Sequence, residues 1–179
     1  SMRRWPPSGR LLPEAEPVAE VRSGVWVAID PGDVRTGVAA SDSGQVLASP
    51  VTTLTRSESV TGVSQVVAER QAAGVIVGLP LSLSGAAGTA ARSARSYAGR
   101  LAGALQVPVY LVDERLTTVS AGAALRAGGH DSRSARRVVD QAAATALLQG
   151  VLDACAARGL DCAGVLDGGL GELVGPDDD

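Results

Sequence analysis

One short segment constrains the fold more than any other part of the chain. Residues 25–29 read Val-Trp-Val-Ala-Ile and end at Asp30, and a Pro-Gly turn over 30–35 leads into a second apolar run over 36–40. A run that is apolar on both faces is typical of a strand at the centre of a covered sheet. A connection this short joins antiparallel neighbours. The segment therefore predicts a central β-hairpin with the carboxylate of Asp30 at the end of its first strand.

The rest of the chain adds strands and then alternates them with helices. We expect three further strands, over 46–54, 75–79 and 107–112. We expect four helices, over 57–73, 89–105, 117–128 and 134–157. Pro50 places the third strand of the chain at a sheet edge or at a bulge. A three-strand antiparallel meander followed by strand–helix–strand units predicts an α/β fold, with a mixed five-stranded sheet and helices on both faces.

Length and composition set the domain organisation. A chain of 179 residues with 45% hydrophobic residues is long enough to bury the core of one domain. We expect a flexible N-terminal extension over 1–23, one folded domain over 24–158 and an acidic flexible tail over 159–179. No apolar run reaches about 18 residues, and no signal-peptide pattern opens the chain, so we expect a cytoplasmic protein without a membrane span.

The charge is distributed unevenly along the chain. The formal net charge is −3, but the last 30 residues carry seven acids against Arg158, which leaves the rest of the chain at +3. Residues 92–137 hold eight arginines against three acids. All basic residues are arginine, whose planar fork suits phosphate. The distribution is compatible with nucleic-acid binding, although ordinary solvated helix faces would also explain single arginines.

The two cysteines are expected to be reduced thiols. Cys155 and Cys162 lie seven residues apart, and in one continuous helix this spacing corresponds to a rise of roughly 10 Å. That separation is too long for an intramolecular disulfide. An intermolecular disulfide is the alternative.

Three acidic positions carry the chemical interpretation. Asp30 ends a strand that is apolar on both faces, so its carboxylate would be partly buried and would need a partner or a metal. In Asp113-Glu114 the side chains alternate, so one acid would be catalytic and the other structural, bound to Arg115 or to a backbone N–H. Of the two we choose Glu114 for the metal. Asp140 lies in an almost entirely apolar helix, where an unpaired acid is costly.

Each of these acids also has a structural explanation. Asp30 could stabilise its own Pro-Gly turn, and Asp140 could be a first-turn acid favoured by the helix dipole. Together, however, acids from two strand ends and one helix suit Mg²⁺ or Mn²⁺, which prefer oxygen ligands. Two such ions roughly 3.5–4 Å apart align a phosphodiester for attack by water. The acids therefore indicate a two-metal nuclease, a hydrolase of phosphodiester bonds.

Four motifs in order resemble the YqgF/RuvX family of proposed Holliday-junction resolvases and pre-16S rRNA nucleases, which have an RNase H-like fold. The motifs are Asp-x-Gly-x-x-Arg-x-Gly-Val-Ala-x-Ser-Asp over 30–42, Gly-Leu-Pro-Leu over 78–81, Asp-Glu-Arg-Leu-Thr-Thr over 113–118 and Val-Asp-Gln-Ala-Ala over 139–143. The resemblance spans about residues 25–152. It implies that Asp30, Glu114 and Asp140 form a metal-binding catalytic triad. It also implies cleavage of pre-16S rRNA or of branched DNA.

The sequence departs from the family pattern at several positions. Val34 replaces the usual lysine beside Arg35, and Ser82 and Ser84 replace the commoner asparagine and aspartate. Arg35 and Arg115 flank the expected site and are the candidates for holding phosphates of the nucleic acid. A salt bridge between Arg115 and Asp113 is the alternative for Arg115. The sole histidine, His130, lies in a Gly-Gly-His-Asp stretch, where a surface position is the simpler explanation than a proton shuttle.

Two other functions compete with the nuclease. A non-catalytic RNase H-like nucleic-acid-binding module would be favoured by the loss of an acid, and none of the three is lost. An actin-like ATPase shares the Asp-x-Gly turn but needs two lobes, whereas this chain has one. The sequence leaves RNA or DNA as the substrate open. Two symmetric cuts in a junction would need two active sites, so a homodimer would favour junction resolution.

Overall fold

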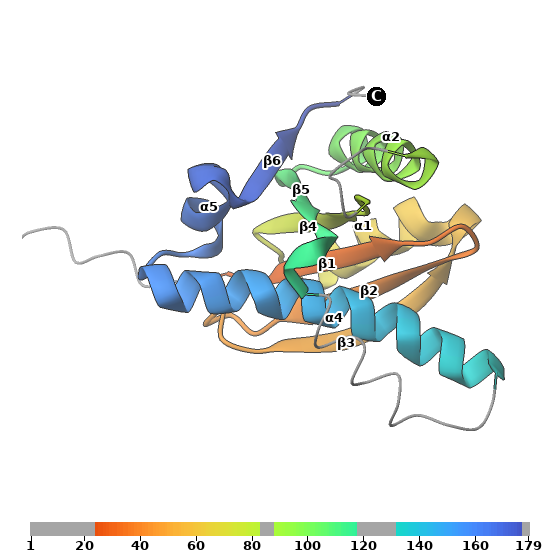
Figure 1. Ribbon diagram of the computed structural model, residues 1–179, viewed down its shortest axis with the longest axis horizontal. Coiled ribbons are helices and arrows are strands. Elements are labelled where there is room, and N and C mark those ends of the chain that lie inside the picture. Colours follow the sequence, from red (N-terminus) through yellow and green to blue (C-terminus); the bar gives the residue numbers. More distant parts are fainter. Residues whose placement is uncertain (1–23, 83–87, 118–131, 177–179) are drawn as a thin grey trace, which may run out of the picture.

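The computed structural model describes residues 24–82, 88–117 and 132–176. These residues form a sheet with helices on both faces (Figure 1). The strands are β1 (Trp26–Pro31), β2 (Arg35–Ser41), β3 (Ala48–Thr55), β4 (Gly74–Leu79), β5 (Val109–Asp113) and β6 (Gly171–Val174). The helices are η1 (Arg56–Glu58), α1 (Ser59–Arg70), α2 (Thr89–Ala104), η2 (Glu114–Thr117), α4 (Ser132–Arg158), α5 (Cys162–Val165) and the π-helical turn η3 (Leu166–Leu170).

The sheet has six strands in the order β3-β2-β1-β4-β5-β6. The hairpin β1–β2 and the pair β2–β3 are antiparallel, whereas β4 is parallel to both β1 and β5. β3 lies at one edge, as Pro50 predicts, and the register of its ladder shifts between Val38 and Ala39. The mixed α/β architecture expected from the sequence is confirmed, but the sheet has one strand more than the five predicted.

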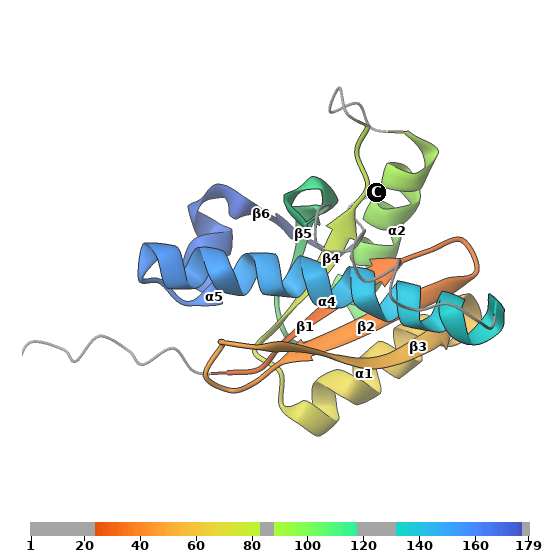
Figure 2. The same ribbon diagram turned by 60° about the horizontal axis from the view of Figure 1, so that its bottom comes forward.

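The two faces of the sheet carry separate cores. Val27, Ile29 and the odd-numbered residues of β5 pack with α1 and α2, whereas Trp26, Ala28 and Tyr110 pack with α4 and α5. Figure 2 shows α4 lying across β1, β2 and β3, with α1 and α2 on the other side. Because side chains alternate along a strand, each residue at a strand end belongs to one of these faces.

The close packing of α4 on the hairpin depends on a glycine. A Cβ placed on Gly37 of β2 would lie 1.9 Å from the backbone oxygen of Asp140 in α4. No side chain fits at that distance, so only glycine allows the helix to approach the strand so closely. This contact fixes Asp140 above β2, opposite Asp30, which pairs with Gly37 across the ladder.

The expectation of a flexible tail over 159–179 is wrong for residues 160–176. Asp161 caps α5 by accepting a hydrogen bond from the Gly164 N–H at 2.7 Å, and β6 then pairs antiparallel with β5. Val165 and Leu166 are fully buried, and Tyr110 donates a 2.5 Å hydrogen bond to Asp167. The apolar residues between the glycines and aspartates outweigh the flexible composition, so the folded domain extends beyond residue 158.

Both cysteines are buried, but the expected distance between them is wrong. The helix ends at Arg158, and Gly159, with φ +65°, reverses the chain. The Sγ atoms of Cys155 and Cys162 therefore lie 3.6 Å apart. The error came from extending one helix through both residues.

Other predictions fall partly outside the described residues. The expected helix over 117–128 and His130 lie there, as do the extension over 1–23 and most of the loop after Ser82. No helix among the described residues is long and apolar enough to cross a lipid bilayer.

Candidate active site

The three acids chosen from the sequence meet at one end of the sheet. Asp30 lies near the end of β1 and belongs to the face covered by α4, because it follows Trp26 and Ala28 in the alternation. Glu114 begins η2, directly after the parallel strand β5. Asp140 comes from α4, which packs on this face. Two strand ends and one helix thus supply the carboxylates.

Asp30 and Glu114 are in direct contact. A hydrogen bond joins their side chains, and the negative charges of Glu114 and Asp140 both act on Asp30. Burial is the largest cause that raises the pKa of Asp30, to about 8, followed by the hydrogen bond and the charge of Glu114. Burial and the neighbouring carboxyl group therefore favour the protonated form of Asp30.

The neighbouring acid Asp113 has a different partner. Its carboxylate accepts hydrogen bonds from the backbone N–H of Arg115 at 2.9 Å and from the guanidinium of the same residue at 2.5 Å. The side-chain hydrogen bond from Arg115 is the main cause that lowers the pKa of Asp113. By the alternation of β5, Asp113 lies on the same face as Val109 and Leu111, whereas Glu114 already belongs to η2. The contact expected for the structural acid of this pair is therefore present.

Asp140 is held by Arg35. The Arg35 Nε lies 3.4 Å from the Asp140 Oδ2, an ion-pair distance. The same Oδ2 is buried and has no hydrogen bond of acceptable geometry to any described residue. Burial raises the pKa of Asp140, and the charge of Arg35 opposes the rise. A buried carboxylate oxygen that has an ion pair but no hydrogen bond is costly, and this marks Asp140 as a candidate ligand for a cation.

The donor set suits a hard divalent cation. Three carboxylates, one with a buried oxygen that accepts no hydrogen bond from the described residues, are the ligands that Mg²⁺ and Mn²⁺ prefer. Among the described residues, however, no three His, Cys, Asp or Glu side chains already form a group that could hold a metal ion. The acids share one end of the sheet without closing into a ligand cage.

The two arginines predicted to bind nucleic acid are both engaged with acids. Arg35 pairs with Asp140 and Arg115 with Asp113. The structure also brings together polar residues that the sequence analysis missed. Arg56, Tyr97 and Arg100 line a small pocket beside the β1–β2 turn. Tyr97 resembled an ordinary core residue in the sequence, and the arginines carried no motif.

The fold and the acids define the class. A mixed sheet that combines an antiparallel meander with parallel strands, and that carries acids at one end, is an RNase H-like architecture. T. thermophilus RuvC in complex with Holliday junction substrate has a similar fold, with a TM-score of 0.51 and 16% sequence identity over 84% of this chain and 99% of that chain.

Sequence comparison identifies the family. The model of the RuvX family, described as Holliday junction resolvase, matches residues 24–154, and the chain belongs to this family of nucleases. A protein of Nocardioides sp. named "Putative pre-16S rRNA nuclease" is 49% identical over 78% of this chain and 94% of its own length. One of Thermobifida fusca with the same name is 51% identical over 74% of this chain and 89% of its own length.

Proposed function

We propose that this protein is a metal-dependent endonuclease that hydrolyses phosphodiester bonds during 5′-end maturation of pre-16S rRNA. The observation that carries the proposal is the meeting of Asp30, Glu114 and Asp140 at one end of the sheet, with Asp30 and Glu114 hydrogen-bonded. The choice of substrate follows the names of the relatives that are 49% and 51% identical. Resolution of four-way DNA junctions, which the family description names, is the second candidate.

Asp30, Glu114 and Asp140 would hold Mg²⁺ or Mn²⁺ at this end of the sheet. When bound, the ion would activate water and stabilise the charge of the phosphodiester during its hydrolysis. Asp30 has to lose its proton before its carboxylate can act as a ligand. The buried Oδ2 of Asp140 offers a further oxygen, and the charge of Arg35 opposes the rise that burial causes in the pKa of Asp140.

Arg35 and Arg115 would act on the nucleic acid from the edge of the site. Each already pairs with an acid, so a phosphate would have to share or replace that contact. For Arg35, the exchange would release Asp140 for the metal as the substrate arrives. Substrate and metal binding would then favour each other.

The non-catalytic binding module receives no support from this site. All three acids are present, and the ion pair of Asp140 with Arg35 is longer than that of Asp113 with Arg115. We propose one protomer as the unit that carries a complete acidic site, since all three acids come from one chain.

Metal binding can be measured without any substrate. Titration of the wild-type protein with Mn²⁺ in a calorimeter should give a site that Asp30→Asn loses. The affinity should rise with pH by up to roughly tenfold per unit below a pH of about 8, because the ion displaces a proton.

Asp113→Asn is the matched control, because this neighbouring acid is bound to Arg115. It should retain the Mn²⁺ site with little change in affinity. Equal Mn²⁺ binding by wild type and Asp30→Asn would remove Asp30 from the proposed metal site. If Asp113→Asn alone lost the Mn²⁺ site, Asp113 and not Glu114 would be the metal ligand of this pair.

A further inference from the structure

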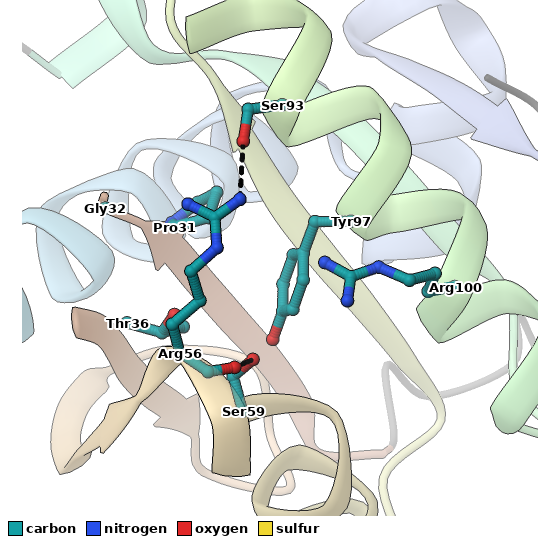
Figure 3. Close-up of a pocket in the computed structure, with 8 residues that line it drawn as sticks. All are labelled: Pro31, Gly32, Thr36, Arg56, Ser59, Ser93, Tyr97 and Arg100. Carbon is teal, nitrogen blue, oxygen red and sulfur yellow. Dashed lines mark hydrogen bonds between the residues drawn. The ribbon is translucent and has the colours of Figure 1, made fainter. Parts of the chain in front are cut away.

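A second polar pocket lies at the same end of the sheet as the acids, but on the opposite face. Pro31 and Gly32, directly after Asp30, form one wall together with Thr36, which pairs with Pro31. Because side chains alternate, Pro31 faces α1 and α2 when Asp30 faces α4. Figure 3 shows this pocket between the β1–β2 turn, Ser59 at the start of α1, and α2.

Two arginines line the pocket without a carboxylate partner among the described residues. Arg56 donates long hydrogen bonds to the backbone oxygen of Asp33 at 3.3 Å and to the Ser93 hydroxyl at 3.2 Å, which leaves other guanidinium donors available. The guanidinium carbon of Arg100 lies 5.5 Å from the centroid of the Tyr97 ring, a cation–π distance. Both arginines are exposed, and no acid lines the pocket.

The hydroxyl of Tyr97 is the unexplained group of this pocket. Tyr97 is only 4% exposed, and its buried hydroxyl has no hydrogen-bond partner among the described residues. The nearby Ser59 hydroxyl instead donates to the backbone oxygen of Arg56 at 2.8 Å. Burial raises the pKa of Tyr97, while the nearby Ser59 hydroxyl and the charge of Arg100 oppose the rise, so the Tyr97 hydroxyl stays protonated and can donate a hydrogen bond. In Figure 3 this hydroxyl points toward Ser59 and the backbone of Arg56, whereas the guanidinium of Arg56 lies toward Ser93.

The size of the pocket limits what can enter. Its cavity volume is about 10 Å³, close to the space that one water-sized atom needs. A base or a whole phosphate does not fit, but one phosphate oxygen does, with the rest of the phosphate outside against the exposed arginines. The donor set matches this ligand, since it combines two cations with one neutral hydroxyl donor.

We propose that Arg56, Arg100 and the Tyr97 hydroxyl bind a second phosphate of the substrate strand. This phosphate neighbours the one at which the same strand is cut. The inference rests on the proposed nuclease function and extends it to the path of the substrate. The strand would cross the end of the sheet, with the scissile phosphate beside Asp30 and the second phosphate beyond the Pro-Gly turn. Recognition here would be of the backbone and independent of base sequence.

The test compares arginine and tyrosine variants in binding and in cleavage. Arg56→Ala or Arg100→Ala should weaken binding of a labelled single-stranded leader RNA roughly tenfold at low salt, the weight of one charge-assisted hydrogen bond. Each should reduce the slope of log K against log salt by about 0.7. In cleavage, KM should rise while kcat at saturation stays near that of the wild type, because this pocket does not touch the reacting atoms.

Two further variants sharpen the result. Tyr97→Phe keeps the ring but removes the hydroxyl, so it should weaken binding several-fold without changing the salt slope, because no charge is lost. Arg70→Ala is the matched control, since Arg70 is an exposed arginine in the last turn of α1, far from the β1–β2 turn. It should behave as wild type in every measurement.

The outcomes separate this inference from the proposed function. If the wild type cleaves while Arg56→Ala and Arg100→Ala match Arg70→Ala, the second phosphate site is wrong and the nuclease stands. If the wild type does not cleave, but these two variants still lose affinity and salt slope, the nuclease is wrong and the phosphate site stands. A wild type that binds no nucleic acid overturns the phosphate site.

Discussion

At the scale of single residues, the site is defined by carboxyl groups in surroundings that make their ionisation unfavourable. The pKa of Asp30 is raised to about 8, mainly by burial, and its hydrogen bond with Glu114 adds to the rise. A group placed like this destabilises the protein when it loses its proton. A carboxyl group whose pKa is raised in this way is typical of residues that bind a cation or take part in catalysis.

The first prediction concerns the pH dependence of stability in the absence of metal. Between the ordinary value of 3.8 and about 8, folded Asp30 keeps a proton that the unfolded chain releases. The free energy of unfolding of the wild type should therefore fall as pH rises, by up to about 1.4 kcal/mol per pH unit. Asp30→Asn cannot titrate, so its stability should depend less on pH and exceed that of the wild type near pH 8.

Urea unfolding in the presence of a chelator, at roughly pH 5, 6 and 7, measures this difference. Asp33→Asn changes an exposed acid of the same turn and should keep the wild-type slope. If the free energies of unfolding of the wild type and of Asp30→Asn changed equally with pH, Asp30 would be ionised throughout this range.

At the scale of elements, one helix and one turn position most of the site. The contact between Gly37 and the backbone of Asp140 leaves no room for a side chain, so β2 determines how deeply α4 sits. Gly37→Ala should force the helix away and cost about 3 kcal/mol or more. It should also abolish metal binding, because Asp140 moves with the helix.

Gly103→Ala in α2 is the control for this substitution. Its added Cβ would meet only Pro176, at 4.0 Å, which is an ordinary contact. The thermal midpoint should be unchanged or raised, because alanine favours a helix over glycine. Wild-type stability in Gly37→Ala would show that α4 can shift at little cost.

The end of the chain provides another prediction at this scale. Deletion of residues 161–179 removes β6 and the buried residues Cys162, Val165 and Leu166, which cover one face of the sheet. We expect the free energy of unfolding, measured with urea, to fall by several kcal/mol. The deletion removes large apolar side chains and a strand pairing together. Glu172→Gln removes only an exposed ion pair with Arg95 and should cost at most about 1 kcal/mol. If the deletion variant and the full chain were equally stable, residues 161–179 would not stabilise the fold, as expected for a flexible tail.

The success of the sequence analysis varied between elements for identifiable reasons. The hairpin over 25–40 and the helix that carries Asp140 have strong apolar patterns, and both are present. β6 was missed because its four residues follow a run rich in glycine and aspartate and pair with a strand some sixty residues earlier. Such pairing depends on distant chain segments, which local patterns do not report.

At the scale of the whole molecule, one end of the sheet gathers polar groups from both faces. The acids of β1, η2 and α4 lie on one face, and the arginines of η1 and α2 lie on the other. The strand ends and motifs pointed to Asp30, Glu114 and Asp140 in the sequence. The pocket around Tyr97 was not predictable, because three distant segments build it and its residues match no motif.

We propose that the three acids make this chain a nuclease for pre-16S rRNA. The most direct test incubates the protein with labelled pre-16S rRNA leader and, in parallel, with a synthetic four-way DNA junction, with Mg²⁺ or Mn²⁺ and with a chelator. Asp140→Asn is the inactive control, and its folding is verified by circular dichroism. We expect metal-dependent cleavage of the leader by the wild type and no cleavage by Asp140→Asn. Cleavage of the junction alone would reassign the substrate, and no cleavage of either by a folded protein that binds both would contradict the nuclease.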